Sequence, residues 1–92
     1  MCNFDNPLTD LPWLKEKIDE FNLLAQESQS ISIAIYQCKY GSEEIGFLVD
    51  EGNIKPFYNC KGEILCIMGG DAGETCSELN IVEQELIWKI NN

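Results

Sequence analysis

The chain has 92 residues and a net charge of −10, from 16 acidic and 6 basic residues, and it contains no histidine. Its length predicts one domain with a modest core, and its 45% hydrophobic content predicts that it folds. The negative charge repels phosphate backbones and anionic lipids, so we expect no binding to nucleic acid or to membrane surfaces. Without histidine, a self-contained serine hydrolase site is excluded and a cysteine hydrolase is not expected.

The first predicted element is an amphipathic helix over about residues 9–26. Thr9 or Asp10 can cap its start, and Pro12 then falls in the first turn, where a missing N–H costs nothing. Apolar residues follow at helical spacing and form one stripe, so the helix is expected to lie on an apolar surface. The stripe consists of Leu14, Ile18, Phe21 and Ala25.

Residues 31–39 and 43–50 are predicted to form a β-hairpin. The first run is rich in β-branched residues, and Gly41-Ser42 suits a two-residue type II′ turn. That turn places Tyr40 opposite Glu43, Cys38 opposite Ile45, Tyr36 opposite Phe47 and Ala34 opposite Val49. If the helix covers one face of this hairpin, an apolar patch for a partner is expected on the other. That patch would include Ile33, Ile35 or Leu48.

Residues 54–58 and 63–68 are predicted to form a second hairpin. Its turn, Asn59-Cys60-Lys61-Gly62, suits a type I turn followed by a glycine bulge. The last segment fits either a strand or a helix between residues 79 and 91, and we favour a strand over 85–91 because Ile87-Trp88 prefers it. The predicted fold is α+β, with one N-terminal amphipathic helix packed on an antiparallel meander of about 4–5 strands.

Four cysteines are candidates for two disulfides, namely Cys38, Cys60, Cys66 and Cys76. A Cys60–Cys66 bridge is disfavoured, because a loop tip and a mid-strand position diverge. Two pairings remain open: Cys60–Cys76 with Cys38–Cys66, or Cys66–Cys76 with Cys38–Cys60. Their spacing contains no C-x-x-C pair, so it matches no common zinc site or thioredoxin-like motif.

The fifth cysteine, Cys2, is a candidate for lipidation. Residues 1–8 are expected to be a tether and residues 9–92 the single α+β domain. No secretory signal follows Met1. One interpretation is a mature lipoprotein start at Cys2, with Met1 added in place of a removed signal, and the other is an ordinary native N-terminus with a free thiol at Cys2. No stretch approaches the roughly 20 apolar residues that span a bilayer.

The candidate partner contacts are Gly70, Asp71, Glu74, Tyr40 and Tyr58. The first three lie in a glycine-rich loop that lacks the lysine of a phosphate-binding loop. The carboxylate clusters do not match the ligand pattern of a calcium loop. We therefore expect no catalytic residues, no cofactor and no metal.

Three stretches carry a resemblance to a known group of domains. They are Asn6-Pro7-Leu8 through Leu11-Pro12-Trp13-Leu14, then Tyr36-Gln37-Cys38, then Tyr58-Asn59-Cys60-Lys61-Gly62-Glu63-Ile64-Leu65-Cys66 with Gly69-Gly70 and Cys76. With these stretches the chain resembles small, uncharacterised, exported or lipoprotein-like domains of Bacteroides-type bacteria. The resemblance implies export and lipidation at Cys2, and it implies no activity.

The function expected from the sequence is a non-enzymatic binding module of the cell envelope, in the periplasm or as an outer-membrane lipoprotein. Its partner would be a protein or a glycan. One alternative is an inhibitor of an exported protease or other hydrolase, in which a rigid loop over residues 69–76 loses little entropy on binding. The other alternative is an intracellular protein that binds zinc through four cysteines or that uses a free thiol.

Overall fold

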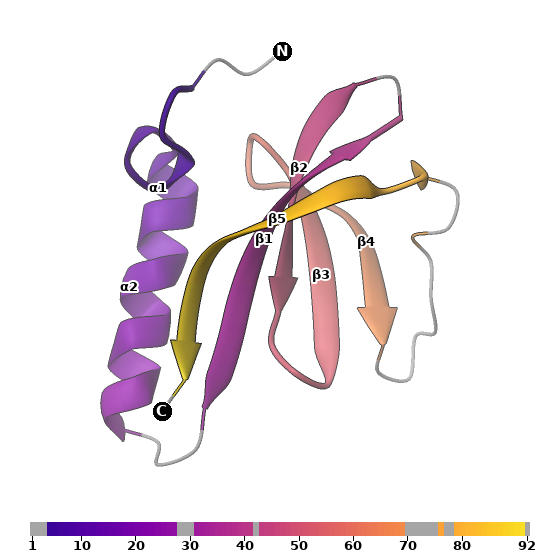
Figure 1. Cartoon of the computed structure of the whole chain (residues 1–92). Helices are drawn as coiled ribbons and strands as arrows, with labels where there is room; N and C mark the ends of the chain where they lie inside the picture. The colour runs from indigo at the N-terminus through magenta and orange to yellow at the C-terminus, as the bar shows by residue number, and fades with distance from the viewer. Residues whose placement is uncertain (1–3, 28–30, 42, 70–75, 77–78, 92) are drawn as a thin grey trace.

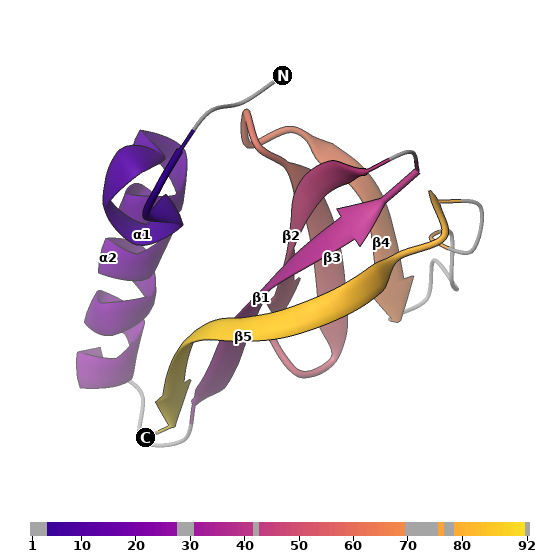
Figure 2. The ribbon, with the colours of Figure 1, turned by 45° about the horizontal axis from the view of Figure 1, so that its top comes forward.

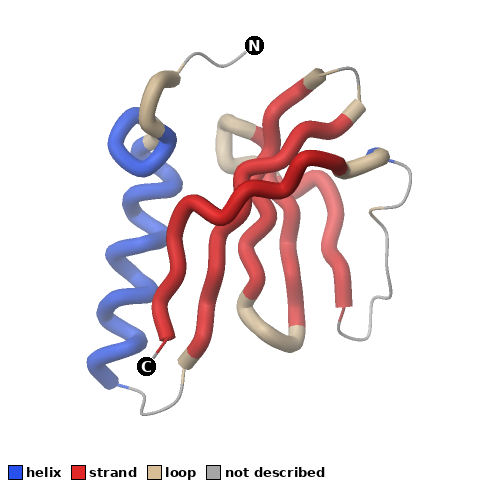
Figure 3. Tube along the Cα trace, viewed as in Figure 1, coloured by secondary structure: helices blue, strands red, loops and turns tan. Residues whose placement is uncertain are grey.

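The computed structural model describes residues 4–27, 31–41, 43–69, 76 and 79–91. Within these ranges the chain forms two consecutive helices and one antiparallel sheet with the strand order β4-β3-β2-β1-β5 (Figures 1 and 3). The elements are α1 (Pro7–Asp10), α2 (Pro12–Glu27), β1 (Ser32–Tyr40), β2 (Glu44–Asp50), β3 (Ile54–Asn59), β4 (Ile64–Gly69) and β5 (Val82–Asn91). The predicted α+β class is confirmed.

The helical region is divided at Leu11, which has an extended backbone between α1 and α2. Pro12 explains the division, because proline disfavours a helical conformation in the residue before it and then starts a helix well. The Asn6 side chain caps α1 by accepting a backbone hydrogen bond of 3.1 Å in its first turn. The predicted helix start at Thr9 or Asp10 is therefore wrong, because helical structure already begins at Pro7.

The described part of the predicted tether, residues 4–8, packs against the rest of the chain. The Phe4 ring lies 5.8 Å from the Phe47 ring, and Leu8 contacts the same hydrophobic core. Residues 4–8 therefore belong to the folded unit, and Cys2 lies outside the described residues.

The larger core lies between α2 and one face of the sheet. Leu14 and Phe21 point inward from α2 and pack with sheet residues from β1 and β2. The fully buried sheet residues of this core are Ile35, Phe47 and Val49, and Ile33 is 5% exposed. Ile33 and Ile35 therefore lie beneath the helix, and the prediction that they belong to an exposed patch is wrong.

The β1–β2 register differs from the predicted one by a single residue. Tyr40 lies opposite Glu44 and Cys38 opposite Gly46, because Glu43 adopts a left-handed backbone conformation (φ 70°) and adds a third residue to the loop. A one-residue shift moves every side chain of a strand to the other face relative to its partner. Cys38 therefore shares a face with Leu48, and Phe47 and Val49 lie on the opposite face.

The second core lies on the face of the sheet away from α2. It contains Cys38, Leu48, Phe57, Cys66 and Cys76, all buried, so Leu48 is not an exposed partner residue either. Gly46 makes room for this core, because a Cβ atom there would lie 2.4 Å from the tip of the Phe57 ring and 2.9 Å from a backbone oxygen. A glycine inside a strand commonly marks such a close approach.

The β3–β4 turn confirms the predicted type I turn with a glycine bulge. The Gly62 N–H donates to the Asn59 carbonyl at 3.1 Å, and Gly62 has a φ of 88°. The Asn59 side chain accepts hydrogen bonds from two further N–H groups of the turn. Trp13 of α2 packs over Gly62 and donates its indole N–H to the Cys60 carbonyl at 2.8 Å, so this turn anchors the start of α2.

The predicted final strand is confirmed as β5, but it lies beside β1 (Figure 2). The meander therefore covers β1 to β4 only, and the last strand crosses back to the other edge. Its pairing with β1 is regular from Trp88 to Asn91 and shifts register before that. In this irregular part Glu83 has a φ of 52°, which is typical of a β-bulge.

Candidate functional site

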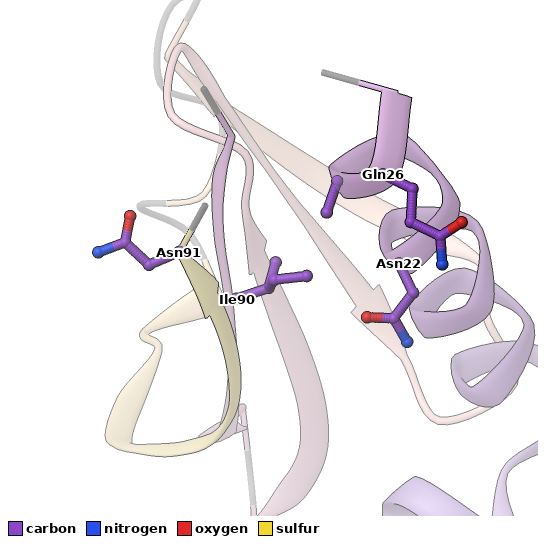
Figure 4. Close-up of a pocket in the computed structure, with 5 residues that line it drawn as sticks. Asn22, Gln26, Ile90 and Asn91 are labelled. Atoms are coloured by element: carbon purple, nitrogen blue, oxygen red, sulfur yellow. The ribbon is translucent and has the colours of Figure 1, made fainter. Parts of the chain in front are cut away.

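A groove of about 470 Å³ lies between α2 and the end of β5 (Figure 4). Asn22, Ala25 and Gln26 line it from α2, and Ile90 and Asn91 line it from β5. In Figure 4 the Ile90 side chain points towards the helix and the Asn91 side chain points away from it. Side-chain amides and aliphatic groups thus border the groove, a mixture that suits a peptide chain.

Helical spacing and strand register together create this groove. The stacked pair Phe21 and Trp88, with ring centroids 6.1 Å apart, holds α2 against β5. Asn22 and Gln26 are four residues apart on α2, so they lie on one face of the helix. The groove opens beside this aromatic contact, between the exposed amides of α2 and the end of β5.

The strand that borders the groove is also an edge of the sheet. Among the described strands, β5 has one neighbour, β1, and no strand pairs with its other side. Val82 and Leu86 on β5 are 44% and 50% exposed. An edge strand presents N–H and C=O groups that can pair with another chain, and the groove lies beside the Ile90–Asn91 end of this edge.

None of the described residues that line the groove is charged. The two elements that border it, α2 and β5, contain six carboxylates and three lysines over their whole lengths, which gives a net charge of −3. Lys39 of β1 already forms an ion pair of 3.4 Å with Glu83 of β5. A partner segment that carries positive charge is therefore favoured over one that carries negative charge.

The structure separates the two tyrosines that were predicted to contact a partner. Tyr58 is only 6% exposed and packs against Trp13, with ring centroids 5.4 Å apart, while the Lys17 ammonium lies 4.8 Å from its ring. Tyr58 is therefore a core residue, and its prediction as a surface contact is wrong. Tyr40 is half-buried and packs edge-on against Phe57 at 5.3 Å, and burial raises its pKa, with a further contribution from Glu44.

The three predicted loop contacts, Gly70, Asp71 and Glu74, lie outside the described residues. The cysteine that ends this loop, Cys76, is described and is buried beneath the sheet face that carries the second core. The loop is therefore anchored to the sheet at Cys76.

One disulfide joins Cys66 to Cys76, with their Cα atoms 5.3 Å apart. Cys38 is free, and Cys60 is disulfide-bonded. The predicted pairing of Cys60–Cys76 with Cys38–Cys66 is therefore wrong, and the other pairing is right only for Cys66–Cys76. The cause is the β1–β2 register, which directs Cys38 into the second core rather than towards the β3–β4 turn.

The free thiol of Cys38 is buried and is protonated at neutral pH. Its residue is 1% exposed, and burial raises the pKa of the thiol to about 11. At neutral pH the thiol therefore stays protonated, whereas thiolate is the form that reacts and binds metals. Because Cys66 and Cys76 are bonded to each other, their sulfurs are not available as thiolate ligands for a metal.

Peptide mapping of oxidised protein is expected to recover three cysteine states. We expect Cys66 linked to Cys76, and Cys38 modified only after denaturation because it is buried as a thiol. We also expect Cys60 to be recovered in a disulfide rather than as a free thiol.

Trypsin separates these states, because it leaves the cysteines on four peptides. Non-reducing mass spectrometry should show peptide 62–89 lighter by two hydrogens, peptide 18–39 alkylated after denaturation, and peptide 40–61 held in a disulfide. Recovery of peptide 40–61 as a free thiol, or of peptide 62–89 without its internal bridge, would contradict these assignments.

Neither a metal centre nor a membrane span is found in the described parts of the chain. No group of three or more potential metal-ligating side chains is brought together there, and no helix there has the length and apolar character needed to cross a bilayer. No protein-family model matches the chain, no curated protein is detectably similar to it in sequence, and no solved structure matches its fold.

The residues of the groove were missed at the sequence level. No role is predicted for Asn22 or Asn91 from the sequence, and Gln26 falls at the end of the predicted helix. One feature of the sequence bears on the groove. If the final segment is a strand, it follows a complete meander and must pair at a free edge of the sheet. Which edge it takes depends on the packing of α2, which local sequence does not encode.

Proposed function

We propose that this protein is a non-enzymatic binding module that takes an extended, basic segment of a partner protein into the groove between α2 and β5. The segment would pair with the outer edge of β5 as an added strand and place its side chains against α2. Strand addition of this kind obtains affinity from main-chain hydrogen bonds and specificity from the pockets for alternate side chains.

The observation that supports the proposal most is the coincidence of a sheet edge with a groove. The β1–β5 pairing is regular from Trp88 to Asn91, so β5 keeps a continuous ladder with β1 where it borders the groove. The bulged part of β5 around Glu83 is less suitable, because a bulge disrupts the regular hydrogen-bond ladder. The proposed contact is therefore the stretch Trp88–Asn91 facing Asn22 and Gln26.

The charge of the chain supports a basic partner over a second copy of the same chain. Each copy carries a net charge of −10, and charged side chains on an edge strand discourage pairing between identical edges. A segment with lysine or arginine residues gains from the same field, both in its rate of encounter and in its orientation.

The oxidised cysteines support an exported setting for this module. Disulfides persist in the periplasm and outside the cell and are rare in the cytosol. The resemblance to exported, lipoprotein-like domains points in the same direction, and we propose the cell envelope as the compartment. The alternative role as a hydrolase inhibitor depends on the loop over residues 69–76, whose tip lies outside the described residues.

Selection of random 12-residue peptides on the immobilised protein tests the proposed function. We expect enriched peptides to combine lysine or arginine with alternating β-branched residues, because an added strand shows alternate side chains to α2. The variant Asn22→Trp, which fills the groove from an exposed position, should weaken binding of an enriched peptide by at least about tenfold, or about 1.4 kcal/mol.

The matched control is Leu23→Trp. Leu23 is the next residue on α2, is 59% exposed and does not line the groove. Binding by this variant should stay within about twofold of the parent, since the new side chain faces solvent. Equal loss in both variants, or enrichment of acidic or helical peptides, would contradict the proposal.

A further inference from the structure

A second pocket, of about 340 Å³, lies over Ala34 on the face of the sheet opposite α2. Its lining comes from four strands and one turn, so it is formed by the sheet itself. The lining residues are Ser32, Ala34, Tyr36, Asp50, Gly52, Lys55 and Lys89.

The strand register explains why a hollow forms at this point. Ala34 lies opposite Asp50 on β2 and opposite Lys89 on β5, so the three residues form a row across the sheet with side chains on one face. Because the side chain of Ala34 is small, the sheet surface is hollow at the centre of this row. Ser32 and Tyr36, two residues away on β1, point to the same face and border the hollow along the strand.

The charges around this pocket run against those of the whole chain. Two of the six basic residues, Lys55 and Lys89, line it, and neither forms an ion pair with any residue that the structure describes. Asp50 is the one carboxylate in the lining. One of its oxygens accepts a 2.9 Å hydrogen bond from the Gly52 N–H, so its other oxygen can accept from a ligand.

We propose that this pocket binds a sugar that carries a carboxylate, the chemistry of a uronic acid. The two ammonium groups exceed the single carboxylate of the lining, so the local charge favours an anionic ligand. The free oxygen of Asp50 and the hydroxyls of Ser32 and Tyr36 suit a ligand rich in hydroxyl groups. A simple anion would form no hydrogen bonds with Asp50, Ser32 or Tyr36. A neutral sugar would form no ion pair with the two lysines.

This inference is independent of the proposed peptide groove. The pocket lies on the other face of the sheet, and none of its lining residues lines the groove. Loss of peptide binding in Asn22→Trp should therefore leave sugar binding unchanged, so the failure of one proposal does not decide the other.

Titration of the isotope-labelled full chain with three probes tests the site, with backbone amide shifts as the readout. The probes are glucuronate, glucose and acetate at equal ionic strength. We expect saturable shifts around Ala34, Asp50 and Lys89 with glucuronate, and binding at least fivefold weaker for each of the other two. Lys55→Ala and Lys89→Ala should each weaken glucuronate binding by about tenfold, the scale of one charge-assisted hydrogen bond.

Lys61→Ala is the matched control, because it makes the same charge change at an exposed position of the β3–β4 turn. Its glucuronate affinity should stay within twofold of the parent. The inference is overturned if acetate or glucose binds as well as glucuronate, if Lys61→Ala loses as much affinity as Lys55→Ala, or if no probe gives saturable shifts at these amides.

Discussion

Replacing Phe47 with alanine is expected to lower the free energy of unfolding by about 3–5 kcal/mol, the cost of removing a fully buried aromatic ring. Phe47 has no exposed surface, and its ring lies 5.8 Å from the rings of both Phe4 and Trp13. It therefore joins the sheet to the N-terminal segment and to α2. Because a domain has only about 5–15 kcal/mol of stability, urea denaturation should show a large shift of the midpoint.

The control for Phe47→Ala is Leu23→Ala on the exposed side of α2. Leu23 is 59% exposed, so its loss should change stability by no more than about 0.5 kcal/mol. If Phe47→Ala is as mild as this control, the core between α2 and the sheet is not packed as described.

Removing the Cys66–Cys76 disulfide is expected to cost about 2–3 kcal/mol, because the bridge closes a short loop and so restricts the unfolded chain. The two cysteines are ten positions apart in sequence. They are also buried, at 6% and 3% exposure, so the double variant Cys66→Ala with Cys76→Ala loses packing in the second core as well. Thermal unfolding followed by circular dichroism measures the loss.

Cys38→Ala provides the comparison for that double variant. It removes a sulfur from the same core without breaking a disulfide, and it should cost about 1 kcal/mol as an ordinary buried truncation. A double variant that is no less stable than Cys38→Ala would show that the bridge contributes nothing beyond packing.

Elements that depend on local chemistry could be predicted from the sequence. The turn from Asn59 to Gly62 has asparagine and glycine at the positions that its backbone requires, and the structure has that turn. The ends of the two strands around it were predicted to within one residue. In such segments the physical cause lies within a few neighbouring residues.

The β1–β2 register could not be predicted in the same way. Gly41-Ser42 is a good two-residue turn, yet the loop takes in Glu43 with a positive φ, which is costly for a residue with a side chain. The gain lies elsewhere, since the shifted register places Gly46 beneath the Phe57 ring. Packing between β2 and β3 outweighs the cost of the positive φ at Glu43. A prediction from turn residues alone does not include that packing.

The candidate site depends still more on non-local contacts. Tyr58 reads as a surface aromatic beside a turn, but Trp13, far away in the sequence, covers it. The groove exists because β5 pairs with β1 and stacks Trp88 on Phe21. No sequence window contains both partners of either contact.

The position of β5 has a consequence for the order in which the protein can fold. β1 is an inner strand of the sheet, but one of its two neighbours, β5, comes last of the described elements in sequence. During folding, β1 keeps one side open until Trp88 and Ile90 of β5 dock against it. The sheet is therefore complete only after this long-range pairing forms, and non-local pairing of this kind slows folding.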